Sequence, residues 1–144
     1  MNRSSPADRS AFKVWRRIST RWADNDAYGH VNNTVYYEWF DSAVNAWLIE
    51  RGLLDVRDGD PIALVVGTHC TYVAPLTFPQ NIDVGLVVAH LGRSSMRYRI
   101  GIFAEDASTA AAEGEFVHVM VDRTTRRPVE IPENWRTALG SIKA

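Results

Sequence analysis

The segment NNTVYYEWFDSAVNAWLIERG, residues 32–52, carries the only long helical pattern in the chain. Apolar side chains recur through it at steps of three and four residues with polar side chains between them, as in an amphipathic helix with a wide apolar face. Asn32 or Asn33 can cap the start of this helix, and Gly52 can end it. About eighteen residues would make a rod of roughly 27 Å. The apolar positions are Val35, Tyr36, Trp39, Phe40, Ala43, Ala46 and Trp47.

Strand patterns account for most of the remaining chain. Residues 11–22 alternate, with Phe12, Val14 and Ile18 on one parity and basic side chains on the other. Four strand patterns follow the helix, and the tail ends in a short helical turn, ENWRTALG. The order β-α-β-β-β-β predicts an α+β domain in which one long helix is wrapped by a five-stranded antiparallel sheet. An α+β roll of another topology fits nearly as well. The later strands are expected at residues 62–73, 82–90, 94–103 and 115–122.

Length, charge and cysteine content narrow the possible classes of protein. With 144 residues the chain is most simply one domain, and we expect residues 1–10 to be a flexible tail and residues 11–144 to fold. The net charge of -1 gives no electrostatic reason to bind nucleic acid or an anionic membrane. Cys70 is the only cysteine and lies in an apolar run, which predicts a buried, inert thiol. It cannot form an intrachain disulfide, and we expect a cytoplasmic location.

A second segment, RWADNDAYGHVNN at residues 21–33, concentrates polar groups just before the helix. It half-resembles a calcium loop, which needs oxygen ligands at positions one, three, five and twelve. Counted from Asp24, position five is Tyr28 and position twelve is Val35, so two ligands are missing. The histidines of the later strands lie in separate patterns without the spacing of a metal site. We therefore expect no metal.

The residues around this segment carry a family resemblance. RWADNDAYGHVNNTVYYEWFDSA resembles the N-terminal motif of the 4-hydroxybenzoyl-CoA thioesterase family of hotdog proteins. Its form D-x-x-G-H-V-N-N is similar to the FadM/YbgC-like acyl-CoA thioesterase branch. The similarity covers nearly the whole chain from Phe12 and continues through YVAPLTFPQNIDV, LGRSSMRYRI and VMVDRTTRRPVEIPENWR.

The resemblance implies a hotdog fold, a homodimer or a dimer of dimers (a homotetramer), and no cofactor. It implies hydrolysis of an acyl-CoA thioester, with a fatty (medium- to long-chain) or aryl acyl group, in lipid metabolism. By position, Asp26 matches the family's catalytic carboxylate, and the backbone N–H of Asn33 would face the thioester carbonyl. Arg93, Ser94 and Ser95 lie near where relatives contact the CoA phosphates, although relatives carry more basic residues there.

The chemistry of thioester hydrolysis fits these residue types. A carboxylate can attack the carbonyl or activate water, and a helix N-terminus supplies unpaired N–H groups for the developing oxyanion. Gly29 allows a tight turn between Asp26 and the helix. His30 could orient the loop or contact substrate. The aromatic residues expected to contact substrate are Tyr28, Tyr36 and Tyr37.

Several alternatives stay open at this level. Asp26 could be only a turn or capping residue, Asp24 is more simply a structural residue that bonds the loop, and Glu38 is an alternative acid on the helix. A hotdog hydratase or dehydratase is one alternative function, but its D-x-N-P-x-H signature spaces the acid and the histidine by four residues rather than three. A non-catalytic acyl-thioester binding protein, or a purely structural dimer, is the other.

Overall fold

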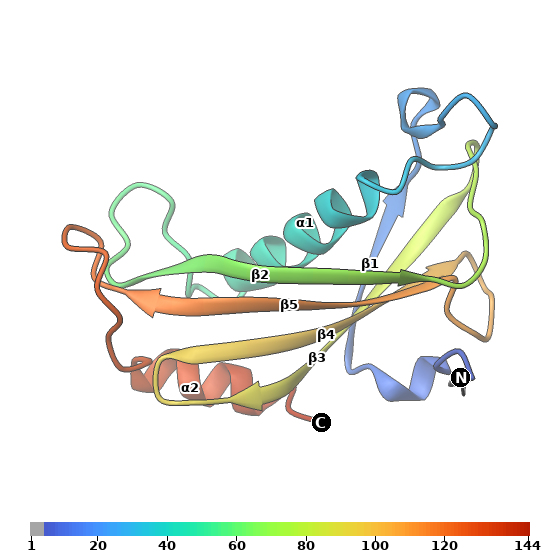
Figure 1. Cartoon of the computed structure of the whole chain (residues 1–144). Helices are drawn as coiled ribbons and strands as arrows, with labels where there is room; N and C mark the ends of the chain where they lie inside the picture. Colours follow the sequence, from blue (N-terminus) through green and yellow to red (C-terminus); the bar gives the residue numbers. More distant parts are fainter. Residues whose placement is uncertain (1–4) are drawn as a thin grey trace.

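The computed structural model describes residues 5–144 and contains five strands, one long helix and one short helix. The strands form a single antiparallel sheet in the order β1-β3-β4-β5-β2. Helix α1 lies across one face of this sheet (Figure 1). The predicted arrangement of a long helix wrapped by five antiparallel strands is therefore confirmed. The elements are β1 (Val14–Ser19), α1 (Val35–Glu50), β2 (Ile62–Tyr72), β3 (Asn81–Leu91), β4 (Ser95–Ala104), β5 (Ala112–Val121) and α2 (Glu133–Gly140).

The apolar face of α1 makes the core with the inner face of the sheet. Phe40 is fully buried, and its ring sits so close to β5 that a Cβ added at Gly114 would meet it at 2.4 Å. Only glycine therefore fits at this point of the strand. The helix ends as predicted at Gly52, which has a φ of 72° and donates its N–H to the carbonyl of Ile49 at 3.0 Å. The buried helix residues are Val35, Tyr36, Trp39, Phe40, Ala43, Val44, Trp47 and Leu48.

The start of α1 differs from the cap expected from the sequence. The N-cap position is Thr34, whose side chain makes no capping hydrogen bond. Asn32 instead accepts the Thr34 N–H through its side-chain Oδ1 at 3.1 Å and the Val35 N–H through its backbone carbonyl at 3.0 Å. Asn32 therefore forms a turn that leads into the helix, and it satisfies N–H groups without being the cap itself.

Two strands differ in length from their sequence patterns. The first is shorter, because Asp24 and Arg21 bond each other's backbone and fold Trp22–Asp24 into a 3-10 turn. The last begins earlier, at Ala112, because residues 112–114 continue the ladder with β2. Ala112 and Gly114 gave the segment the appearance of a turn, whereas the close approach of the Phe40 ring requires the glycine at position 114.

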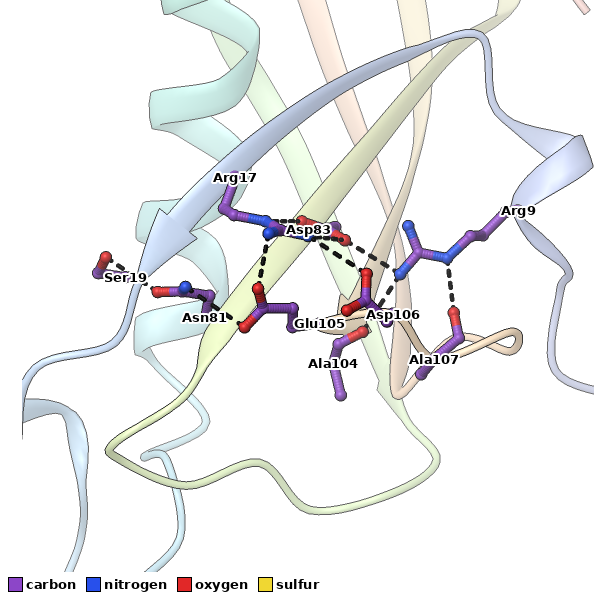
Figure 2. Close-up of polar contacts among 9 residues, drawn as sticks. All are labelled: Arg9, Arg17, Ser19, Asn81, Asp83, Ala104, Glu105, Asp106 and Ala107. Carbon is purple, nitrogen blue, oxygen red and sulfur yellow. Dashed lines mark hydrogen bonds and ion pairs between the residues drawn. The ribbon is translucent and has the colours of Figure 1, made fainter.

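The N-terminal segment packs on the outer face of the sheet, opposite α1. Residues 1–4 of the predicted flexible tail lie outside the described residues. Phe12 fills a recess where a Cβ at Gly101 would meet its ring at 2.5 Å. Arg9 bonds the buried carboxylate of Asp83 at 3.0 Å, and Arg17 of β1 bonds the same group at 2.9 Å (Figure 2). The hydrogen bonds from Arg17 and then Arg9 hold the pKa of Asp83 below its ordinary value. This network joins the segment before β1 to β3.

The two edges of the sheet are β1 and β2. The edge strand β2 and the residue after it expose apolar side chains at Val65, Val66, Tyr72 and Val73, with Val66 62% exposed. An unpaired edge of eleven residues with apolar side chains is a surface that proteins usually cover. Among residues 5–144, no helix is long and apolar enough to cross a membrane.

A buried histidine in the core predicts how stability depends on pH. His118 of β5 lies beside the rings of Tyr98 and Phe116, and burial lowers its pKa to about 4. The unfolded chain binds this proton near pH 6.5, so stability that is complete above that pH is lost as the pH falls toward 4. We expect the free energy of unfolding to drop by about 2 kcal/mol between pH 7 and pH 5 through this group. Urea unfolding curves recorded at pH 7 and pH 5 measure this difference in the free energy of unfolding.

The matched comparison for this pH prediction is His118→Phe against His69→Asn, since His69 is exposed on β2. His118→Phe should flatten the pH dependence, whereas His69→Asn should leave it as in the unsubstituted protein. Equal slopes for all three proteins would show that His118 does not set the pH dependence.

Candidate active site

The loop between β1 and α1 is organised by a buried carboxylate. Asp24 is 0% exposed and accepts hydrogen bonds from the backbone N–H of Arg21 at 2.7 Å and from its guanidinium, also at 2.7 Å. Its backbone carbonyl accepts the N–H of Asn32 at 2.8 Å. These hydrogen bonds join the two ends of the loop. This geometry agrees with the interpretation of Asp24 as a structural residue that bonds the loop backbone.

A second loop, residues 73–80 between β2 and β3, holds the outer part of the first. The N–H of Val31 donates to the carbonyl of Leu76 at 2.8 Å, and the Thr77 hydroxyl donates to the carbonyl of Gly29 at 2.8 Å. The side chain of Asn25 accepts the N–H of Phe78 at 3.1 Å. The polar segment of the sequence is therefore fixed at several points against the connection that follows β2.

Asp26 lies at the start of a tight turn within this loop. Its N–H donates to the carbonyl of His30 at 2.8 Å, and the turn passes through Gly29, whose φ is 79°. One carboxylate oxygen, Oδ1, accepts the N–H of Tyr28 at 2.8 Å and that of His30 at 3.4 Å. Among residues 5–144, no group donates a hydrogen bond to the other oxygen, Oδ2. The hydrogen bonds to Oδ1 thus orient the side chain, and Oδ2 is free to take part in chemistry.

Asn33 presents its backbone just before the helix. Its carbonyl accepts the hydroxyl of Tyr72 at 2.9 Å. Within the described part of the chain its N–H donates to no acceptor. The preceding peptide is held because its carbonyl, that of Asn32, accepts the Val35 N–H. Since N–H and C=O point in opposite directions across a trans peptide, the N–H of Asn33 points away from the helix, as do the free donors of a helix N-terminus.

These groups open into one pocket of about 350 Å³. The loop before α1 and the start of the helix form one wall, and the end of β2 with the residues after it forms the other. A larger hollow, of about 790 Å³, lies between the end of α1 and α2, and no residue of the loop at 21–33 lines it. The smaller pocket is therefore the one that the polar loop before α1 lines. Its lining residues are Asp26, His30, Val31, Asn33, Tyr36, Tyr72, Val73, Ala74 and Pro75.

Buried hydroxyl and thiol groups near this pocket stay protonated at neutral pH. Burial raises the pKa of Tyr36 to about 12 and that of Cys70 to about 11. Neither group is therefore an anionic nucleophile, and Asp26 is the carboxylate that lines the pocket. Within residues 5–144, no three His, Cys, Asp or Glu side chains cluster in a way that could hold a metal ion.

The structure brings together four of the residues singled out in the sequence: Asp26, His30, Asn33 and Tyr36. Two other aromatic residues do not line the pocket, because the Tyr28 side chain is 87% exposed and Tyr37 packs beside Phe40. The alternative acid, Glu38, opens into a different groove.

The three residues expected near the CoA phosphates lie far from Asp26 within one protomer. Arg93, Ser94 and Ser95 are at the β3–β4 turn, whereas the loop of Asp26 contacts the segment that leads into the start of β3. The length of β3, eleven residues at about 3.3 Å each, separates the two ends of the sheet. Their expected role stays a prediction.

Sequence reasoning did not assign a role to the second wall of the pocket. Tyr72, Val73, Ala74 and Pro75 come from the end of β2 and the residues after it. The only signal was the stretch YVAP, which carried part of the family resemblance. The hydrogen bond from Tyr72 to the backbone of Asn33 is a long-range contact that the local sequence pattern does not report.

Comparison with known proteins identifies related chains. A family model described as the thioesterase-like superfamily matches residues 20–139. The crystal structure of the PA5185 protein from Pseudomonas aeruginosa strain PAO1 superposes with a TM-score of 0.94 at 50% identity, covering 97% of this chain and 98% of that chain. The PA2801 protein of Pseudomonas aeruginosa, provisionally named a thioesterase, superposes with a TM-score of 0.81 at 31% identity, covering 87% and 96%. An Aquifex aeolicus (strain VF5) protein, provisionally named an esterase, is 25% identical over 122 residues, which are 83% of this chain and 94% of the relative.

Proposed function

The chain belongs to the thioesterase-like superfamily and is a thioester hydrolase, and from that premise we propose that it hydrolyses acyl-CoA thioesters. The acyl group is fatty, of medium to long chain, or aryl, and the products are the free acid and CoA. This chemistry belongs to lipid metabolism. A cytoplasmic location agrees with a single buried cysteine and no possible intrachain disulfide.

The observation that carries this proposal is that Asp26 and Asn33 line one pocket. A carboxylate with one uncommitted oxygen and an uncommitted N–H just before the helix belong to the same wall of this pocket. Thioester hydrolysis requires this pair of functions, because negative charge moves from the attacking group onto the carbonyl oxygen. Val31, Val73, Ala74 and Pro75 add apolar surface to the lining, which suits an acyl group.

The reaction follows from these positions. The thioester carbonyl lies near the N–H of Asn33, which donates a hydrogen bond to the oxygen as it becomes an oxyanion. Asp26 either attacks the carbonyl carbon to form an acyl anhydride that water then hydrolyses, or removes a proton from a water that attacks. The C–S bond breaks and CoA leaves as a thiolate, so the leaving group needs no strong general acid. His30, whose backbone bonds Asp26, keeps the turn in place.

The test of the function is a panel of acyl-CoA substrates with a thiol reagent that detects free CoA. We expect Asp26→Asn to lower kcat by at least ~100-fold with the fold retained, since this is the scale of losing a general base. Glu38→Gln is the control for the alternative acid, and it should retain turnover because Glu38 opens into another groove.

Other results would point elsewhere. Near-full turnover in Asp26→Asn together with loss in Glu38→Gln would transfer the chemistry to the helix. A change in enoyl absorbance without free CoA would indicate a hydratase. Binding of acyl-CoA with neither signal would indicate a non-catalytic acyl-thioester binding protein.

The exposed edge of β2 supports a homodimer. Antiparallel pairing of two β2 strands about a two-fold axis would satisfy the backbone of both edges and cover Val65 and Val66. It would also place the opposite end of the partner's sheet beside the pocket of Asp26. The β3–β4 turn is at that end, so Arg93 of the partner subunit is one of the cations that such pairing would bring toward the CoA phosphates. Two such dimers could associate as a tetramer.

We expect a mass of about 32 kDa or more in solution by light scattering, against 16.2 kDa for one chain. Val66→Arg should shift the mass toward the monomer, because the charge would be buried at the paired edge. Thr137→Arg on α2, away from β2, adds the same charge and should leave the mass unchanged. A monomeric unsubstituted protein at micromolar concentration would contradict the proposed assembly.

The walls of the pocket predict how rate varies with acyl length. The ring of Tyr36 contacts those of Trp39 and Tyr72 at centroid distances of 5.0 and 4.9 Å, and Phe40 fills the core behind them. Each buried methylene contributes about 0.8 kcal/mol, so kcat/KM should rise by up to ~4-fold per carbon until the chain reaches these rings. We expect a maximum at medium length followed by a fall. A profile flat from acetyl to palmitoyl, or activity only with aryl-CoA, would reject a fatty acyl substrate while leaving thioester hydrolysis intact.

A further inference from the structure

Tyr72 is the last residue of β2 and contacts the one backbone segment on which the proposed oxyanion contact depends. Its hydroxyl donates to the carbonyl of Asn33 at 2.9 Å across a sequence separation of 39 residues. Its ring packs edge-on against Tyr36, at 4.9 Å between centroids and 87° between planes. The side chain therefore joins the second wall of the pocket to the start of α1.

The geometry around Asn33 shows what this contact does. The peptide before Asn33 is held because the Asn32 carbonyl accepts the Val35 N–H at 3.0 Å. The peptide after it is held at its carbonyl by the Tyr72 hydroxyl and at its N–H, that of Thr34, by the side chain of Asn32 at 3.1 Å. Asn33 is exposed and precedes the first residue of the helix by two positions, so helical hydrogen bonds do not fix its carbonyl. Without Tyr72 the peptide after Asn33 would keep only the hydrogen bond from its Thr34 N–H to the exposed side chain of Asn32.

We infer that Tyr72 is a positioning residue, which aims the N–H of Asn33 at the thioester carbonyl oxygen by fixing the following peptide. This inference rests on the proposed function, in which that N–H stabilises the oxyanion. A donor is most effective when it is already oriented before charge develops, so a residue that fixes the donor acts on the chemical step more than on binding.

The hydroxyl of Tyr72 is suited to this task at any physiological pH. Burial, with further contributions from Cys70 and Tyr37, raises the pKa of Tyr72 above its ordinary value. The group thus remains a protonated donor, and a carbonyl is an acceptor only. The direction of the bond cannot reverse.

The variant Tyr72→Phe removes the hydroxyl and keeps the ring against Tyr36. We expect kcat for the best acyl-CoA substrate to fall about tenfold and KM to change less than about twofold. A tenfold loss of rate is at the upper end of what one neutral hydrogen bond contributes, and it is below the ~100- to 1,000-fold loss that follows removal of an oxyanion donor itself. In ¹⁵N-labelled protein, the amide signals of Asn33 and Thr34 should shift.

Thr68→Val is the matched control on the same strand. Thr68 also donates its hydroxyl to a backbone carbonyl, that of Glu115 at 3.1 Å, but lies outside the pocket. Thr68→Val should lower Tm by about as much as Tyr72→Phe does, since each variant removes one hydrogen bond to a backbone carbonyl. Its kcat and the amide signals of Asn33 and Thr34 should stay unchanged.

Three results would overturn the proposal: unchanged Asn33 and Thr34 signals in Tyr72→Phe, an equal loss of kcat in Thr68→Val, or a Tyr72→Phe protein that no longer folds, which would make the residue structural. If the unsubstituted protein hydrolyses no acyl-CoA, the proposed function fails. In that case the amide signals alone still decide whether Tyr72 orients Asn33, so the two failures are distinguishable.

Discussion

The buried carboxylate of Asp24 is the interaction on which the rest of the site depends. A charge that is 0% exposed is stable only when fully paired, and here the backbone and guanidinium of Arg21 supply the partners. The carbonyl of the same residue receives the N–H of Asn32. One residue thus joins the segment after β1 to the turn before α1. Asp26 and His30 lie in the short part of the loop between Asp24 and Asn32.

The sheet contributes as much to the site as the loop does. In the connection after β2, Leu76 and Thr77 form hydrogen bonds with the backbone of the loop before α1. The hydroxyl of Tyr72 donates to the backbone carbonyl of Asn33. A carboxylate and an uncommitted amide therefore line one pocket although neither belongs to a regular element. The wall that completes their pocket is an unpaired strand edge, which links the proposed catalysis to the proposed assembly.

Local patterns in the sequence predicted the helix and the sheet because burial imposes their periods. The apolar residues that recur every three or four positions from 35 to 48 form the face of the helix that packs on the strands. What the patterns missed was set by contacts distant in sequence. Ala112–Gly114 resembled a turn, yet the segment is a strand because it pairs with β2, and its glycine is needed because the ring of Phe40 takes the space at position 114. Asp26 and Asn33 could be proposed from a motif, but Tyr72 could not, since its partner is 39 residues away.

The most direct test of the account uses an acyl-CoA analogue in which a methylene replaces the thioester sulfur, so that the carbonyl remains and cannot be hydrolysed. Titrated into ¹⁵N-labelled protein, it should move the amide signal of Asn33 strongly downfield as the N–H bonds the ketone oxygen, with smaller changes at Gly29 and His30. An unmoved Asn33 signal, with the changes gathered instead around Glu38 or between the end of α1 and α2, would contradict the placement of the reaction in this pocket.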